Sequence, residues 1–162
     1  MNILKFNKAA LLSLPVMSLL LLVPAAYASP PATGSGTFNA TVTSETVVHS
    51  DNGNTLYRFT GQDDFTGTQT GTGPFTLTLL VHSSGADTGS GTVTCSCIVG
   101  GQTGTIDIQF TSSGTFGGTG DGHFEAAGSG GLAGYHAVGD FQFVTTATGF
   151  TGPYQLEYHS TG

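Results

Sequence analysis

Hydrophobic and polar residues alternate along most of the chain after residue 36, with the two-residue period of half-buried β-strands. In one such segment Phe75, Leu77, Leu79 and Val81 fall on one face, and threonines fall on the other. No window has a sustained helical period. The alternation predicts eight strands, at Thr37–Ser44, Leu56–Thr60, Pro74–His82, Gly91–Val99, Gly104–Phe110, Phe124–Ala126, Asp140–Phe143 and Tyr154–His159.

Turn-forming residues separate these segments, as in Asp51-Asn52-Gly53-Asn54 and Thr151-Gly152-Pro153. One apolar face per strand indicates an antiparallel sheet with one side in water. Short connections favour hairpins between consecutive strands, and eight such strands can close into a barrel that has no exposed edge. We therefore predict an all-β domain over residues 37–162, an eight-stranded antiparallel up-and-down barrel. A two-sheet β-sandwich is the alternative.

The N-terminus has the features of a secretory signal peptide. Lys5 and Lys8 precede a leucine-rich run from Ala9 to Val23, and small residues follow in Ala26-Tyr27-Ala28. We predict cleavage after Ala28, a secreted or periplasmic location, and a flexible lead-in over residues 29–36. An uncleaved membrane anchor is disfavoured, because Pro15 interrupts the apolar run and a spanning helix needs about 20 apolar residues.

Charge narrows the range of partners. The chain has ten acidic residues, and Arg58 is the only lysine or arginine outside the predicted signal peptide, which leaves one positive against ten negative side chains, a formal charge of −9. Binding to nucleic acid requires several lysines or arginines, and an anionic membrane surface also attracts basic segments. We expect neither nucleic acid nor a membrane as a partner of the mature domain. The 26 glycines all follow Ala28 and suit turns and bulges between strands.

The glycine-rich segment Gly128–Gly139, followed by the closing strand Tyr154-Gln155-Leu156-Glu157-Tyr158, resembles a family of uncharacterised bacterial barrel proteins similar to allene oxide cyclase and dirigent proteins. Shorter pieces at Gly36–Phe38, Phe65–Gly71 and Gly101–Ile106 also fit. The resemblance implies an eight-stranded barrel whose lumen, in some relatives, binds or cyclises an apolar small molecule. The chain has no cyclase catalytic motif to which residue roles could be transferred.

An eight-stranded barrel is just wide enough to fill itself with side chains or to hold one small ligand. The first hypothesis is a module that binds a small apolar ligand in its lumen. The second is a cofactor-free cyclase or isomerase whose aromatic cavity includes Tyr57, Tyr154 and Tyr158. The third is a non-catalytic extracellular structural protein with a solid barrel. The candidate lumen residues are Tyr57, Phe59, Phe75, Tyr154 and Tyr158.

Cys95 and Cys97 lie two residues apart on one predicted strand face. Residues at this spacing in an extended strand are about 6.6 Å apart, whereas the Cβ atoms of a disulfide are about 3.8 Å apart. Strand geometry therefore favours two reduced thiols that pack in the core. A disulfide that bends the strand at Ser96 is the alternative, and intermolecular or metal-binding roles come after it.

The remaining candidates carry weaker signals. Asp63 and Asp64 are interpreted as solvated turn carboxylates, since the alternating acidic positions of a calcium loop are absent. Arg58 is expected in a surface or rim ion pair, with a cation at the barrel mouth as the alternative. We expect no cofactor and no metal, because no dinucleotide or phosphate-binding motif is present and the histidines lack ligand spacing. These histidines are His49, His82, His123, His136 and His159.

Overall fold

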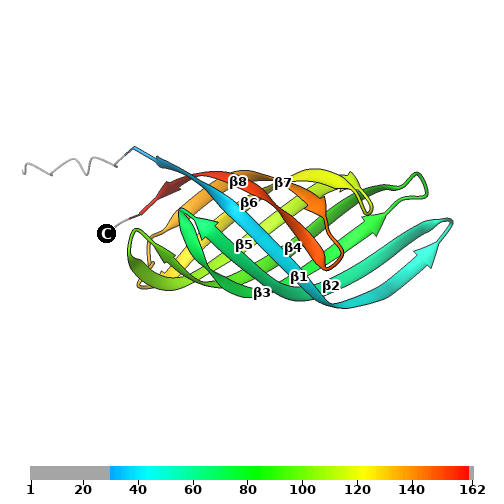
Figure 1. The fold of residues 1–162 in the computed structure, drawn as a ribbon, viewed down its shortest axis with the longest axis horizontal. Coiled ribbons are helices and arrows are strands. Elements are labelled where there is room, and N and C mark those ends of the chain that lie inside the picture. Colours follow the sequence, from blue (N-terminus) through cyan, green and yellow to red (C-terminus); the bar gives the residue numbers. More distant parts are fainter. Residues whose placement is uncertain (1–29, 161–162) are drawn as a thin grey trace, which may run out of the picture.

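The computed structural model describes residues 30–160, which form a closed barrel of eight antiparallel strands in sequence order (Figure 1). The predicted fold class is confirmed, and the alternative of a β-sandwich is excluded. The strands are β1 (Ala32–Asp51), β2 (Asn54–Gly67), β3 (Gln69–Val81), β4 (Ala86–Val99), β5 (Gln102–Thr115), β6 (Thr119–Gly130), β7 (His136–Thr145) and β8 (Gly149–His159).

The first and last strands close the barrel. β1 pairs with β8 from Ala32 opposite Tyr158 to Thr41 opposite Gly149. Residues 32–36, which were expected in a lead-in, therefore belong to the barrel wall. The predicted signal peptide and its cleavage site lie outside the described residues. Within residues 30–160, no helix is long and apolar enough to span a membrane.

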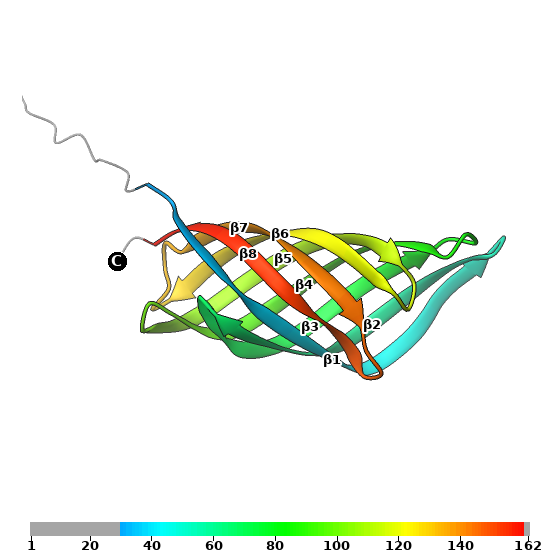
Figure 2. The same ribbon diagram turned by 45° about the horizontal axis from the view of Figure 1, so that its top comes forward.

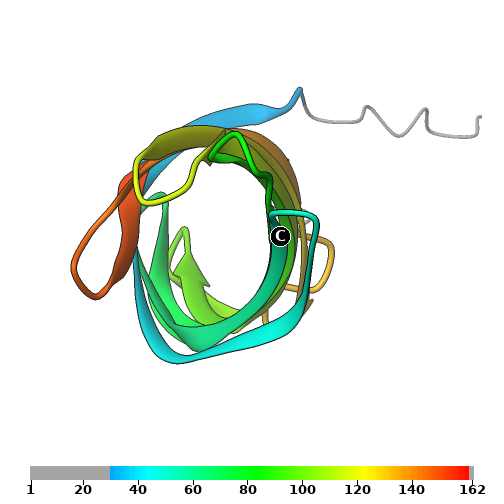
Figure 3. The ribbon, with the colours of Figure 1, turned by 90° about the vertical axis from the view of Figure 1, so that its right-hand side faces the viewer.

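One end of the barrel carries an extended hairpin. Beyond Val42, whose N–H still donates to the carbonyl oxygen of Thr148, β1 pairs only with β2, with register shifts at Val42/Ser44 and Val47/His49. The β1–β2 and β3–β4 hairpins consequently reach further along the barrel axis than the β7–β8 turn (Figure 2). Figure 3 views the ring of strands end-on from this side.

The opposite end of the barrel is filled by the glycine-rich turn between β6 and β7. In this turn Leu132 and Tyr135 are buried, and the tilted ring of Tyr135 lies 5.7 Å from that of Tyr158. Gly128 makes room for the fold-back, because a Cβ atom there would lie 2.8 Å from Cβ of Tyr135. The glycine-rich segment, which carries the family resemblance, therefore closes this end of the barrel. We call it the closed end.

The structure joins Cys95 and Cys97 in a disulfide within this closed half, so the expectation of reduced thiols is corrected. Their Cα atoms are 5.4 Å apart rather than the spacing of a fully extended strand. Both cysteines are fully buried on the inner face of β4. The bridge therefore replaces two thiols in the core and does not contact solvent.

Candidate ligand-binding lumen

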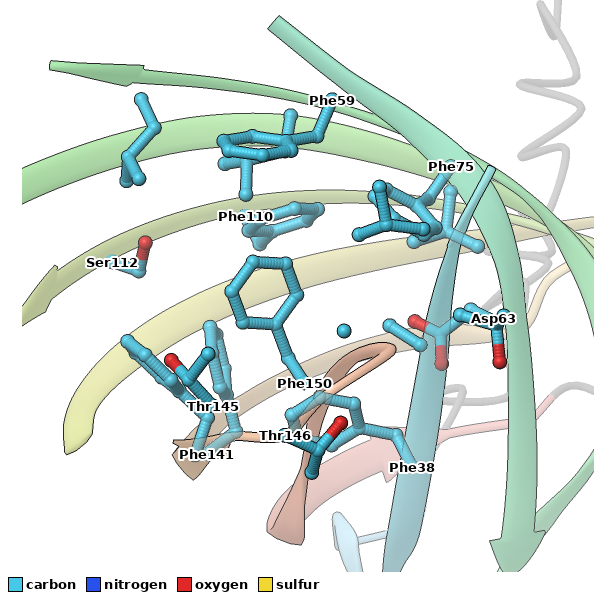
Figure 4. Close-up of a pocket in the computed structure, with 18 of the residues that line it drawn as sticks. Phe38, Phe59, Asp63, Phe75, Phe110, Ser112, Phe141, Thr145, Thr146 and Phe150 are labelled. Atoms are coloured by element: carbon cyan, nitrogen blue, oxygen red, sulfur yellow. The ribbon is translucent and has the colours of Figure 1, made fainter. Parts of the chain in front are cut away.

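The other half of the barrel is hollow. A cavity of about 490 Å³, called the lumen below, extends inward from the turns β5–β6 and β7–β8. Every phenylalanine among the described residues contributes to its wall, and Figure 4 shows several of them around the cavity. These are Phe38, Phe59, Phe65, Phe75, Phe110, Phe116, Phe124, Phe141, Phe143 and Phe150. The interior is therefore packed at the closed end and hollow at the opposite end, which we call the mouth.

Glycines on the inner face explain why so many aromatic rings leave room for a lumen. Several phenylalanine rings lie directly over a glycine of the adjacent strand, at a place where another residue would have a side chain. A Cβ atom at Gly61 or Gly139 would lie 2.6 Å from a ring carbon of Phe75 or Phe124. Gly122 has the same relation to the ring of Phe141. The rings therefore lie against the wall instead of meeting in the middle.

The rings hold each other in place through edge-to-face contacts. The ring centroids of Phe38 and Phe141 are 5.7 Å apart at an interplanar angle of 89°. Phe150 makes the same type of contact with both Phe59 and Phe143, each at 6.1 Å. This geometry is favoured by the aromatic quadrupole. It fixes the shape of the lumen before any ligand arrives.

Three polar side chains of β2, β3 and β8 line the lumen among its phenylalanines. The Tyr154 hydroxyl donates to the carbonyl oxygen of Thr66 at 3.0 Å and accepts from the backbone N–H of Gln69 at 3.3 Å. Asp63 is 6% exposed and Gln69 is 1% exposed. Oδ1 of Asp63 and Oε1 of Gln69 have no hydrogen-bond partner in the protein. Two buried oxygens of the lumen wall are therefore free to accept hydrogen bonds.

Asp63 has an unusual proton affinity for a carboxylic acid. Burial, and secondarily the negative charge of Asp64, raises the pKa of Asp63 from 3.8 to about 7. The interpretation of Asp63 as a solvated turn carboxylate is therefore wrong, although Asp64 is exposed as expected. The alternation Tyr57, Phe59, Gly61, Asp63 continues through β2 and places Asp63 on the inner face. This alternation continues past Thr60, the predicted end of the strand, and could have located Asp63 on the inner face from the sequence.

Two further carboxyl groups line the lumen near its mouth, on Glu45 and Asp87. Asp87 is buried, its Oδ1 has no partner, and burial raises its pKa. In Figure 4, Ser112 and Thr145 lie across the lumen from Asp63. No lysine, arginine or histidine is among the described residues that line the lumen. Its ionisable groups are therefore three carboxyls and the phenol of Tyr154.

The structure separates the predicted lumen residues into two groups. Phe59, Phe75 and Tyr154 line the lumen. Tyr57 stacks on Phe59 and on Phe116, with centroids 5.8 and 5.4 Å apart, and supports the wall without lining it. Tyr158 packs on Tyr135 in the closed half. Sequence reasoning missed Asp63, Gln69 and Asp87 as lumen residues.

The remaining candidates lie elsewhere. Arg58 is exposed on the outer face, opposite Thr46 and Thr78, and does not line the lumen. Among the histidines, His123 pairs with Asp140 at 3.0 Å on the outer surface. Over the part of the chain that the structure describes, no group of three histidine, cysteine or acidic residues is arranged to hold a metal ion.

Comparison with known proteins shows the fold and nothing finer. No family model and no curated protein matches the chain. A protein of unknown function from the DUF3224 family of Shewanella oneidensis MR-1 is similar in structure, with a TM-score of 0.64 and 17% identity, over 82% of this chain and 98% of that chain. An enzyme from Penicillium herquei matches with a TM-score of 0.52 and 14% identity, over 79% of this chain and 96% of that chain. The resemblance to allene oxide cyclase and dirigent proteins stays a prediction.

Proposed function

We propose that the protein binds one small, largely apolar molecule in its lumen. The observation that carries this proposal is a cavity of about 490 Å³ walled by phenylalanines. Ligand pockets typically have volumes of about 300–1,000 Å³ and mostly apolar walls with a few convergent polar groups. The lumen has that composition, with Asp63, Gln69 and Tyr154 among its lining residues. A cavity of this size argues against the hypothesis of a solid structural barrel.

A second candidate function is that of a cofactor-free cyclase or isomerase. It is supported by Asp63, whose pKa of about 7 suits a group that donates or accepts a proton at neutral pH. The family resemblance and the structural likeness to an enzyme point the same way. Asp63 and Tyr154, rather than Tyr57 or Tyr158, would contact the substrate in such a reaction, because only the former two line the lumen.

Titration with the neutral fluorophore N-phenyl-1-naphthylamine tests binding directly. We expect its emission to rise and shift to the blue as it leaves water for the phenylalanine-lined lumen. Ala40 lines the lumen, so Ala40→Leu adds bulk inside it and should weaken binding about tenfold or more. Ala127 is exposed on the outer face of β6, so Ala127→Leu is the matched control and should bind like the wild type.

Two results would overturn the proposal. One is a wild-type protein that does not enhance the emission of the fluorophore at all. The other is an Ala40→Leu variant with an unchanged far-ultraviolet circular dichroism spectrum and unchanged affinity, which would place the fluorophore outside the lumen. Native mass spectrometry of the purified protein then identifies a co-purified ligand by its mass.

We also propose that the protein is exported and that its leader is removed after Ala28. The support is the sequence of the leader alone. N-terminal sequencing of protein recovered from the periplasm or the culture medium should begin at Ser29. Recovery of the full-length chain in the membrane fraction would contradict this.

A further inference from the structure

The lumen combines three carboxyl groups with an aromatic wall and has no basic side chain among its described residues. We propose that its ligand is a hydrophobic amine, whose ammonium group pairs with Asp63 while its apolar body packs among the phenylalanine rings. This inference rests on the proposed binding function and specifies the chemistry of the ligand.

The unpaired oxygens of the lumen favour a ligand that donates hydrogen bonds. Oδ1 of Asp63 and Oε1 of Gln69 are both buried, both line the lumen and both lack a partner. Buried polar atoms are almost always paired, so two unpaired acceptors in the wall of one cavity indicate a donor-bearing ligand. An ammonium group supplies three N–H donors and no acceptor. A ligand carboxylate would instead add a negative charge beside unpaired oxygens.

The charge distribution favours a cation over a neutral donor. Glu45 and Asp87 add carboxyl groups near the mouth, and Arg58, the only lysine or arginine in the described residues, is on the outer face. Carboxyl groups of one sign in a cleft with low-dielectric walls concentrate the potential and attract ligands of opposite charge. A formal charge of −9 on the mature domain acts in the same direction over longer distances.

The aromatic wall is compatible with a cation as well as with an apolar body. The face of a phenylalanine ring carries negative electrostatic potential, and a cation within about 6 Å of the ring centroid is attracted to it. The edge-to-face packing of Phe38 on Phe141 and of Phe59 on Phe150 holds neighbouring rings roughly perpendicular to each other. The phenylalanine wall therefore suits the apolar body of an amine and does not repel its ammonium group.

The proposal predicts a specific pH dependence. Free Asp63, with a pKa of about 7, is partly protonated at neutral pH, and a bound ammonium would stabilise its anion and lower that pKa. Binding should therefore release protons near pH 7, and affinity should rise from pH 6 to 8. The other titratable groups around the site are Asp64 beside it on β2, Glu45 of β1, Asp87 of β4 and Tyr154 of β8. β3 contributes Gln69, which does not titrate.

The test compares three probes with the same naphthalene body and different head groups. These are 1-naphthylmethylamine, 1-naphthylmethanol and 1-naphthoic acid, each titrated at pH 8 as a competitor of N-phenyl-1-naphthylamine. We expect the amine to bind about tenfold or more tightly than the alcohol, because a charge-assisted hydrogen bond is stronger than a neutral one. The acid should bind most weakly. Calorimetry at pH 7 in two buffers of different ionisation enthalpy should detect proton release for the amine only.

Asp63→Asn removes the charge and keeps the shape of the side chain. In this variant the affinity for the amine should fall to that for the alcohol, and the proton release should disappear. Asp121 is exposed on the outer face, so Asp121→Asn makes the same change in net charge and should keep the preference for the amine.

The relative affinities of the three probes for the wild-type protein test the amine proposal even if a variant does not fold. If the neutral fluorophore binds but the alcohol or the acid competes as well as the amine, the amine proposal fails and the proposed binding function stands. If neither the fluorophore nor any of the three probes binds, both fail. An Asp63→Asn variant that folds and still prefers the amine overturns the role of Asp63.

Discussion

The hydroxyl of Tyr154, on the last strand, accepts a hydrogen bond from the backbone N–H of Gln69, at the start of β3, at 3.3 Å. The same hydroxyl donates to the carbonyl oxygen of Thr66 at 3.0 Å. The phenol thereby ties β8 to the β2–β3 turn through the interior of the barrel. It marks the boundary between the open lumen and the packed closed half.

Removal of this hydroxyl should cost stability. We expect Tyr154→Phe to lower the free energy of unfolding by about 1–3 kcal/mol, because it leaves the buried N–H of Gln69 without its side-chain acceptor. Urea denaturation followed by circular dichroism measures this. Tyr57→Phe is the matched control and should change stability by less than about 0.5 kcal/mol, because Tyr57 is only partly buried. Equal effects of the two substitutions would contradict the structural role of the Tyr154 hydroxyl.

Burial of Asp63 should make the stability of the protein depend on pH. A carboxyl whose pKa rises from 3.8 to about 7 on folding binds protons more tightly in the folded state, so stability falls as the pH rises from about 4 to about 7. The cost above pH 7 amounts to at most about 4 kcal/mol. Asp63→Asn should therefore be more stable than the wild type at pH 8 and should lose most of its advantage at pH 4. If the difference in urea midpoint between the wild type and Asp63→Asn is the same at pH 4 and at pH 8, the burial of Asp63 is contradicted.

The glycines beneath the rings should resist substitution. A Cβ atom at Gly122 would collide with the ring of Phe141 and with the carbonyl oxygen of Thr111, so Gly122→Ala should cost about 1–3 kcal/mol. Adding Phe141→Leu should recover part of that cost, which a double-mutant cycle would reveal as coupling.

Gly118→Ala is the control for this experiment. Gly118 lies in a turn, and its nearest neighbour, the Thr115 carbonyl oxygen, would be 3.2 Å from an added Cβ atom. This substitution should be close to neutral. A neutral Gly122→Ala would mean that the rings are not held against the wall.

The disulfide between Cys95 and Cys97 should be hidden from reagents in the folded protein, because both residues are fully buried. We expect no alkylation in denaturant without a reductant, and an intact mass lower by two hydrogens than that of the reduced chain. With a reductant, alkylation of both thiols should require denaturant as well. Two alkylated cysteines in denaturant alone would contradict the bridge.

The sequence predicted the barrel well because apolar residues occupy every second position along each strand and so fall on one face. Phe75, Leu77 and Leu79 are buried on β3, and Tyr154 and Leu156 are buried on β8, as the alternation predicts. The ends of strands were predicted less well. β1 continues to Asp51 and β2 to Gly67, because backbone pairing extends beyond the apolar residues that make a strand visible in the sequence.

The polar residues of the lumen were missed for a related reason. Asp63, Gln69 and Asp87 lie at inner positions where an apolar residue would be expected, so composition alone assigns them to solvent. The distinction between a solid and a hollow barrel depends on the cross-strand pairing of rings with glycines, such as Phe141 with Gly122. That pairing requires the register between strands, which alternation within one strand does not contain.

A crystal structure of the protein with a brominated analogue of 1-naphthylmethylamine tests the central claim most directly. The account predicts anomalous scattering from bromine inside the lumen, among Phe59, Phe141 and Phe150, with the ammonium nitrogen within hydrogen-bonding distance of Asp63. Bromine found only on the outer face of the barrel, or a lumen filled by the protein's own side chains in the crystal, would contradict it.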